Sequence, residues 1–316
     1  PTTPRASPER PRRGATPPEG GSGCLPLRRG AWSAPSGRVR RAAVKGHAMT
    51  GFLAGRIALV TGSTSGIGLA IGKALAAEGA RIGVNGLADA AERDGALAAL
   101  REAGAPEARF FDADLTDAAA IDAMMDDVAA WGGCDVLVNN AGMQKTISIA
   151  ELDRGLWDKF MALNLSACFH TMHRAMPAMA EKGYGRVLNI ASVHGIVASK
   201  NKSPYVSSKF GLVGLTKVAA LEYAATGSRE TGGVTVNAIC PGWVETPLIE
   251  PQIEAMAEKH GGDRAAGVRE LLSEKEPSLR FAAPEDLGAL ALFLCSQAAH
   301  NITGVAIPVD GGWTAQ

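Results

Sequence analysis

The chain has 316 residues, enough for one large domain or two small ones, and 46% of them are apolar, as in a globular α/β protein with a large core. The formal net charge is zero. However, the residues before Met49 include ten Arg or Lys and two Glu, so this segment is about +8 and the remainder about −8. The remainder therefore lacks the general basic surface that binding to nucleic acid requires.

The cysteines and the apolar runs bear on the cell compartment. The five cysteines have neither metal-ligand nor redox spacing, which indicates free thiols in a reducing compartment and a cytoplasmic location. No apolar run reaches the ~18 residues of a membrane span, and the longest, residues 287–299, is expected to be a buried helix. We expect no metal site and no membrane partner. The cysteines are Cys24, Cys134, Cys168, Cys240 and Cys295.

The first 50 residues differ in composition from the rest of the chain. They are rich in Pro, Arg, Gly and Ser and lack periodicity, so we expect a disordered basic tail, with one folded domain over 51–316. The tail has three interpretations: an organelle transit peptide, a basic arm for an anionic partner, or translated sequence upstream of a true start at Met49. The last is favoured, because the prolines do not suit an amphipathic targeting helix.

From residue 55 onwards, short apolar runs alternate with helical stretches. Alternation of this kind predicts right-handed βαβ units in a single doubly wound α/β domain, with a mostly parallel seven-stranded sheet and helices on both faces. The expected strands are 56–62, 80–86, 108–115, 135–142, 185–192, 234–242 and 303–312. The expected helices include one from about residue 66, 91–104, 117–133, 156–170 and 203–226.

A glycine-rich turn, TGSTSGIG at 61–68, joins the first strand to the first helix. Gly62 permits a tight turn, while Gly66 and Gly68 permit close approach of the backbone to a pyrophosphate. The helix N-terminus would supply free N–H groups and the positive end of its dipole. The turn therefore predicts a nucleotide site. It is not an NTPase loop, because no Lys-Ser or Lys-Thr follows the last glycine.

Several motifs together resemble the short-chain dehydrogenase/reductase family over roughly residues 53–315. The resemblance implies a single Rossmann-like domain that binds NAD or NADP, usually in a homotetramer. The motifs are the Gly-x-x-x-Gly-x-Gly spacing, NNAG at 139–142, Asn164, Ser192, YVSSK at 205–209 and PG at 241–242. The cofactor-binding positions carried over are Gly62, Thr64, Ser65, Gly66, Ile67, Gly68, Asp114, Leu115, Asn140, Ala141, Gly142, Tyr205, Lys209, Pro241, Gly242, Val244 and Thr246.

Tyr205 and Lys209 are one turn apart on the helix expected at 203–226. A lysine ammonium close to the phenol would lower the phenol pKa and prepare it for general acid/base chemistry on an alcohol or ketone. Ser192, just past a strand, could hydrogen-bond the substrate oxygen. By resemblance Asn164 holds a water that links Lys209 to solvent. Asn164, Ser192, Tyr205 and Lys209 then form the family's catalytic tetrad, with hydride passing to or from the nicotinamide.

The segment after the second strand, VNGLADAAE, bears on the choice of cofactor. It holds no Arg or Lys for a 2′-phosphate and includes Asp89, whereas Arg93 lies further along the next helix. The sequence therefore favours NAD over NADP. By resemblance, Asp114 contacts the adenine, and a helix cap is its alternative role.

Other polar residues predict a site for a small carboxylate. Gln144, His194, Lys202 and Gln252 can converge on one pocket with Ser192 and Tyr205. Trp243 and Trp313 can form its apolar walls or belong to the core. Longer segments, such as NLSACFH, NKSPYVSSK and ELLSEKEPSL, resemble bacterial family members that interconvert (R)-3-hydroxybutyrate and acetoacetate with NAD. That resemblance assigns the four polar residues to the carboxylate, the tryptophans to the methyl end, and about 246–280 to a mobile helical lid.

Two other functions stay open from the sequence. One is a reductase or dehydrogenase of another 3-oxo or 3-hydroxy acid or acyl thioester, which a basic 2′-phosphate site and a longer pocket would favour. The other is an NAD-binding scaffold without catalysis.

Overall fold

The computed structural model describes residues 51–315, so the predicted basic tail lies outside the described residues. Within that range one parallel sheet has the strand order β3-β2-β1-β4-β5-β6-β7, which confirms the predicted doubly wound architecture. The strands are β1 (Ile57–Val60), β2 (Arg81–Val84), β3 (Ala108–Phe110), β4 (Val136–Asn139), β5 (Tyr184–Ile190), β6 (Gly233–Pro241) and β7 (Ala306–Val309).

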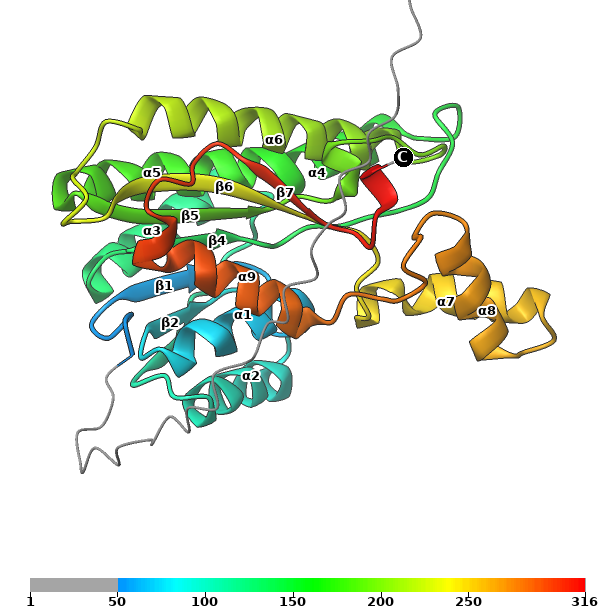
Figure 1. Ribbon diagram of the computed structural model, residues 1–316, viewed down its shortest axis with the longest axis horizontal. Coiled ribbons are helices and arrows are strands. Elements are labelled where there is room, and N and C mark those ends of the chain that lie inside the picture. Colours follow the sequence, from blue (N-terminus) through cyan, green and yellow to red (C-terminus); the bar gives the residue numbers. More distant parts are fainter. Residues whose placement is uncertain (1–50, 316) are drawn as a thin grey trace, which may run out of the picture. The chain divides into compact units, whose positions relative to one another are not determined.

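Helices cover both faces of this sheet (Figure 1). α1, α2 and α9 pack together on one face, and α3, α5 and α6 pack on the other. α7 and α8 form a separate pair, set apart from the helices that cover the sheet. The helices are α1 (Gly66–Ala77), α2 (Ala90–Glu102), α3 (Ala118–Trp131), α4 (Arg154–Met161), α5 (Ala167–Lys182), α6 (Ser203–Tyr223), α7 (Glu250–Lys259), α8 (Arg264–Ser273) and α9 (Pro284–Cys295).

The central strands are apolar because each has two buried faces. In β1, Ala58 and Val60 pack in the core beneath α1 and α9, whereas Leu59 packs in the core beneath α3 and α5. All four residues of β1 are buried, and so are all four of β4. Near-continuous apolar runs, and not alternating ones, are expected of such strands.

The third strand is shorter than the sequence predicts. β3 ends at Phe110, whereas a strand over 108–115 is expected from the apolar run. Past that point the side-chain amide of Asn85 donates to the carbonyl oxygens of Phe111 and Ala113, at 3.1 and 3.2 Å. A side chain thus takes the place of a strand partner, and the chain leaves the sheet.

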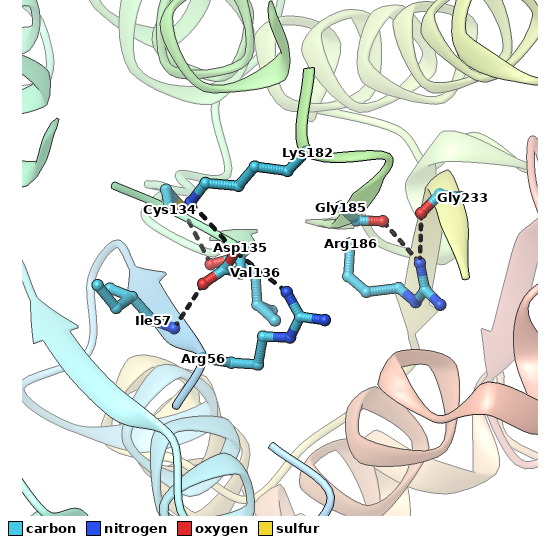
Figure 2. Close-up of polar contacts among 9 residues, drawn as sticks. All are labelled: Arg56, Ile57, Cys134, Asp135, Val136, Lys182, Gly185, Arg186 and Gly233. Carbon is cyan, nitrogen blue, oxygen red and sulfur yellow. Dashed lines mark hydrogen bonds and ion pairs between the residues drawn. The ribbon is translucent and has the colours of Figure 1, made fainter. Parts of the chain in front are cut away.

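Charged side chains tie the strands together at the edge where they begin (Figure 2). Asp135, just before β4, accepts the backbone N–H of Ile57 at 3.0 Å and pairs with Arg56 at 3.5 Å and Lys182 at 3.3 Å. The Nη1 of the buried Arg186 donates to two carbonyl oxygens at the starts of β5 and β6, at 2.8 and 2.9 Å. These contacts hold the sheet together on the side away from the glycine turn.

Two asparagines form a buried polar ladder through the middle of the sheet. Asn139 and Asn189 are register partners on β4 and β5, and the amide of Asn139 donates to Asn189 Oδ1 at 2.9 Å. Thr171 on α5 donates to Asn139 at 2.7 Å, and Asn189 donates to Thr216 on α6 at 2.9 Å. These hydrogen bonds offset the cost of burying the two amides.

The connections reverse direction between β1 and β4, at the centre of the sheet. The chain leaves β1 for α1 on one face, and leaves β4 towards α4 and α5 on the other. In open α/β sheets the ligand crevice lies at this switch point, beyond the carboxyl ends of the strands. Among the described helices, none is both long and apolar enough to cross a membrane.

Candidate active site

A cavity of about 290 Å³ lies at this switch point. Its walls come from the turn after β1, from the loops after β4, β5 and β6, from the start of α6 and from the chain end. It brings together most of the residues singled out in the sequence. Those that line it are Gly62, Ser65, Gly66, Ile67, Asn140, Ala141, Gly142, Gln144, Ser192, His194, Lys202, Tyr205, Lys209, Pro241, Gly242, Trp243, Val244, Thr246 and Trp313.

The glycine turn has the shape of a phosphate cradle. Gly62 has a φ of +59° and Gly66 a φ of +54°, which side chains rarely adopt. A Cβ on Gly62 would lie 2.8 Å from the Ala141 Cα, so this side of the cleft tolerates only hydrogen there. α1 begins at Gly66, and its N-cap residue Ser65 makes no side-chain capping bond. The first N–H groups of α1 therefore remain available to an anion, and the residues present fit a dinucleotide.

Asn140 joins the glycine turn to the loop after β4. Its amide donates to the carbonyl oxygens of Thr61 and Gly62 at 3.0 and 2.8 Å. Gly68 lies buried beneath this contact, where a Cβ would sit 2.5 Å from the Asn140 Nδ2. Gly68 thus serves the close packing of helix and loop and does not line the cavity.

Tyr205 and Lys209 both line the cavity from α6, as their spacing predicts, but their electrostatics differ from expectation. The Lys209 Nζ donates to the Ile190 carbonyl at 2.8 Å and lies 5.7 Å from the centre of the phenol ring. Burial raises the pKa of Tyr205, and a hydrogen bond with Ser192 opposes that rise. The net direction is thus opposite to the lowering that the sequence predicts: burial dominates, and the Lys209 ammonium faces a backbone carbonyl.

Asn164 is fully buried and lies in a π-helical turn, Ala162–Ser166, where the sequence predicts an ordinary helix. Its Oδ1 accepts the Met143 N–H at 2.9 Å, and its Nδ2 donates to the Met143 carbonyl at 2.9 Å and to Ser208 Oγ at 3.3 Å. The side chain therefore fastens the loop after β4 to α6. π-Turns often mark functional positions, but the water-holding role of Asn164 stays a prediction.

Polar groups gather at the other end of the cavity between two aromatic rings. Lys202 donates to Gln144 Oε1 at 2.8 Å and lies 5.7 Å from the Trp243 ring. Burial, and secondarily the charge of Lys275, lowers the pKa of Lys202 to about 8. The ring centres of Trp243 and Trp313 are 6.0 Å apart. This end therefore combines one cation and one amide with an apolar wall.

His194 is buried beside these groups, 5.4 Å from the Trp313 ring and 5.7 Å from the Tyr205 ring between centres. Burial, with the charges of Lys202 and Lys275, lowers its pKa to about 4. The imidazole is therefore neutral at physiological pH. It carries one N–H donor and one acceptor but no charge, and its two ring nitrogens face the hydroxyls of Ser192 and Ser199.

Lys275 and Ser199 belong to this region, although the sequence did not point to either. The Lys275 Nζ donates to Ser199 Oγ at 3.0 Å and lies 5.4 Å from the Trp313 ring, and Ser199 Oγ lies 2.9 Å from His194 Nε2. A lysine in a charged helical stretch normally indicates a solvated face. Only its placement after α8, next to the chain end, brings it to His194.

Glu276 follows Lys275 and is also buried. Burial raises the pKa of its carboxyl to about 7, with the nearby Asp310 adding to the rise and the Trp243 backbone N–H opposing it. Neither carboxyl oxygen has a hydrogen-bond partner of normal geometry among the described residues. A Cβ on Gly242 would lie 2.9 Å from Glu276 Oε1, so this carboxyl packs directly against the loop after β6.

Some predicted site residues do not reach the cavity. Gln252 lies on α7, half-buried, and is absent from the lining. Asp114 is exposed, and its Oδ1 accepts both the N–H and the hydroxyl of Thr116 at 2.8 Å, so it closes a local turn; the N-cap of α3 is Asp117, and the helix-cap alternative for Asp114 is wrong. Leu115 is buried and Thr64 half-buried, both outside the lining. The adenine contact of Asp114 stays a prediction.

The end of β2 carries no positive charge within reach of the glycine turn. Asn85 is buried and occupied by the carbonyls after β3, and Leu87 is exposed. Asp89 caps α2 by accepting the Glu92 N–H at 2.9 Å, and Arg93 pairs with its neighbour Asp94 at 3.0 Å. Asp89 thus has a structural task, so its acidity is weaker support for NAD than the sequence suggested.

The arrangement as a whole suits proton transfer at an oxygen held between Ser192 and Tyr205, next to a dinucleotide cradle. Among residues 51–315, no group of three or more His, Cys, Asp or Glu side chains is placed to hold a metal ion. Hydride chemistry by a nicotinamide is the reaction that these residues can support.

Comparison with known proteins agrees with this geometry. The family model described as short chain dehydrogenase matches residues 56–257. D-beta-hydroxybutyrate dehydrogenase of Cupriavidus necator is 51% identical over 84% of this chain and 100% of its own length, and that of Rhizobium meliloti is 44% identical over 83% and 99%. The crystal structure of L-sorbose reductase from Gluconobacter frateurii, complexed with NADPH and L-sorbose, is 30% identical and superposes with a TM-score of 0.77, covering 84% of this chain and 99% of that chain.

Proposed function

Because the chain belongs to the short-chain dehydrogenase family, we propose that it interconverts (R)-3-hydroxybutyrate and acetoacetate with NAD. The observation that carries the substrate assignment is the far end of the cavity, where Lys202 and Gln144 meet beside Trp243. A short acid with one charged end and one methyl end matches a cation and an amide set against an apolar wall.

The reacting oxygen binds between Ser192 and Tyr205. In the reduction direction Tyr205 donates its proton to the carbonyl oxygen and becomes a phenolate, and in oxidation the phenolate takes the hydroxyl proton. The nicotinamide, when bound, accepts or supplies the hydride at the same carbon. The raised pKa of Tyr205 supports the role of proton donor, because the phenol holds its proton until a partner oxygen arrives.

Lys209 and Asn164 complete the proposed tetrad. Lys209 lines the cavity next to Gly142, where a Cβ would lie 3.6 Å from its Nζ, and this position supports a contact from the ammonium to a ribose hydroxyl. Asn164 holds Met143 and thereby fixes the loop that carries Gly142. The remaining cofactor contacts carried over from the family belong to the same proposal.

NAD is the proposed cofactor because the described residues place no free cation where a 2′-phosphate would lie. The glycine turn has no basic residue, Leu87 projects into solvent, and Arg93 is paired with Asp94. A 2′-phosphate normally binds an arginine at this position.

Further parts of the proposal concern motion and assembly. Residues 246–280 act as a lid: α7 and α8 are joined by Gly261 and Gly262, with φ of +67° and +92°, and closure would bring Gln252 to the cavity. Exposed apolar side chains on α5 and α6, among them Phe169 at 48% and Leu221 at 80%, support a homotetramer. Four free, buried cysteines in the described part support a cytoplasmic location.

A substrate panel with purified protein tests the proposal. Absorbance of the reduced nicotinamide is followed with (R)- and (S)-3-hydroxybutyrate, longer 3-hydroxy acids and their acyl thioesters, each with NAD and NADP. We expect turnover of the (R)-acid with NAD. Turnover of long acyl thioesters in preference to the free acid would replace this function, and no turnover of any compound would favour a binding scaffold.

A further inference from the structure

A chain of hydrogen bonds leads from Lys275 to the reacting oxygen. The Lys275 Nζ lies 3.0 Å from Ser199 Oγ, and Ser199 Oγ lies 2.9 Å from His194 Nε2. On the other side of the ring, His194 Nδ1 lies 3.4 Å from Ser192 Oγ. Ser192 and Tyr205 both line the cavity in which the reacting oxygen would bind. Lys275 and three side chains from the connection between β5 and α6 thus form one line that ends in the cavity beside Tyr205.

Lys275 gives this line a direction. An ammonium group only donates, so Ser199 Oγ must accept from it. The single Ser199 proton is then free to point at His194 Nε2, which makes Nε2 an acceptor. When Nε2 accepts this proton, the neutral imidazole carries its own proton on Nδ1. Nδ1–H therefore faces Ser192.

Ser192 receives two donors as a result. Its Oγ accepts the His194 backbone N–H at 3.1 Å and faces the ring Nδ1–H. With both lone pairs occupied, the Ser192 proton is left to point at Tyr205 or at a substrate oxygen. In the opposite tautomer, Nδ1 would attract the Ser192 proton away from that oxygen. The Ser199 proton would then also lack an acceptor among the described residues.

We propose that Lys275 and Ser199 are positioning residues that fix His194 in its Nδ1–H tautomer, so that Ser192 donates its proton to the reacting oxygen. Neither residue needs to touch the substrate. This inference rests on the proposed function for its consequence in turnover, but the tautomer itself is a property of the folded chain. Lys202, the other cation facing His194, bonds Gln144 and stands outside the line.

Nitrogen-15 NMR of the imidazole rings tests the proposal on the full-length protein. The His194 signal is assigned with His194→Gln. We expect a protonated δ1 and an unprotonated ε2 nitrogen in the parent. Ser199→Ala and Lys275→Met should shift protonation towards ε2 and lower kcat by about tenfold, the contribution of one hydrogen bond. Ser199→Thr and Lys275→Arg should restore both readouts. Lys200→Met, an equal charge change at an exposed neighbour, should alter neither.

The two readouts separate this inference from the function beneath it. An unchanged tautomer in Ser199→Ala overturns the proposal, whatever the activity. So does a rise in KM for the acid in Lys275→Met with the tautomer and kcat preserved, because Lys275 would then act only as a charge. The parent protein could also prove inactive towards the acid while Ser199→Ala still moves the His194 proton from Nδ1. That result would refute the substrate assignment and support the role of Ser199 in fixing the tautomer. Ser199→Ala serves alone if Lys275→Met does not fold.

Discussion

Lys202→Met is the sharpest test of how the cavity recognises its substrate. The Lys202 ammonium is buried, and its pKa is lowered to about 8 from an ordinary 10.5. Burial, together with the charge of Lys275, therefore disfavours the Lys202 charge by roughly 3 kcal/mol. A group held at this cost is charged below about pH 8 and neutral above it. A substrate carboxylate should therefore meet a cation only on the acid side of that value.

The expected loss follows from the bond that is removed. A hydrogen bond to a charged group contributes about 1.5–3 kcal/mol, so Lys202→Met should lower kcat/KM for acetoacetate by about 10- to 150-fold at pH 7. At pH 9 only about a tenth of the parent enzyme still carries the charge, so the ratio of parent to variant should shrink about tenfold. The ratio cancels other titrations common to both proteins, such as that of Tyr205.

Steady-state kinetics between pH 6.5 and 9.5 give this ratio directly. The methyl ester of the same acid is the matched control, because it lacks the carboxylate and should show little effect of the substitution at any pH. A ratio for the free acid that stays constant across pH 8 would refute the reasoning, and so would an equal loss with the ester. Either result would mean that Lys202 shapes the cavity and does not supply charge.

Three other substitutions test separate parts of the site. Tyr205→Phe should lower kcat by about 10²- to 10⁴-fold while NAD still binds, as measured by turnover and fluorescence titration; retained turnover would remove Tyr205 from its role. Asn164→Ala leaves the Met143 N–H and carbonyl without partners and should cost about 2–4 kcal/mol in urea unfolding, and a loss well below this range would mean that water replaces the amide. Folded Glu276 keeps its proton up to about pH 7, whereas the unfolded chain loses it near pH 4.5, so its burial destabilises the fold progressively across that window. Glu276→Gln should therefore stabilise the protein by up to about 3 kcal/mol more at pH 8 than at pH 4.5, and an equal gain at both would contradict this.

The fold could be predicted because patterns within short segments determine its strands, helices and turns. Apolar runs and helical stretches alternate, and the tight turn after β1 needs glycines with positive φ. The two ends of β3 illustrate the limit: its start was correct, but its end depends on Asn85, a side chain from another strand. A contact between segments distant in sequence leaves no local signature.

The sequence predicted which residues line the cavity better than it predicted the contacts that they make there. Four-residue spacing places Tyr205 and Lys209 in one cavity, but spacing does not reveal which acceptor the ammonium faces. Lys275 escaped notice because its role depends on where α8 ends relative to Ser199. Gln252, expected from family resemblance, lies on a helix whose position relative to the cavity the sequence does not encode locally.

The paired amides of Asn139 and Asn189 have a consequence for accuracy at the reacting atoms. Neighbouring residues along a strand are about 3.3 Å apart, so a slip of β5 by one position would carry Ser192 that far from the loop after β4. Misplacement of even about 1 Å can cost a hundredfold in rate. A slip of β5 along β4 is unfavourable because it would leave the buried amides of Asn139 and Asn189 without hydrogen-bond partners. The hydrogen bond between Asn139 and Asn189 thus fixes the register of β5 on β4, and with it the position of Ser192 in the cavity.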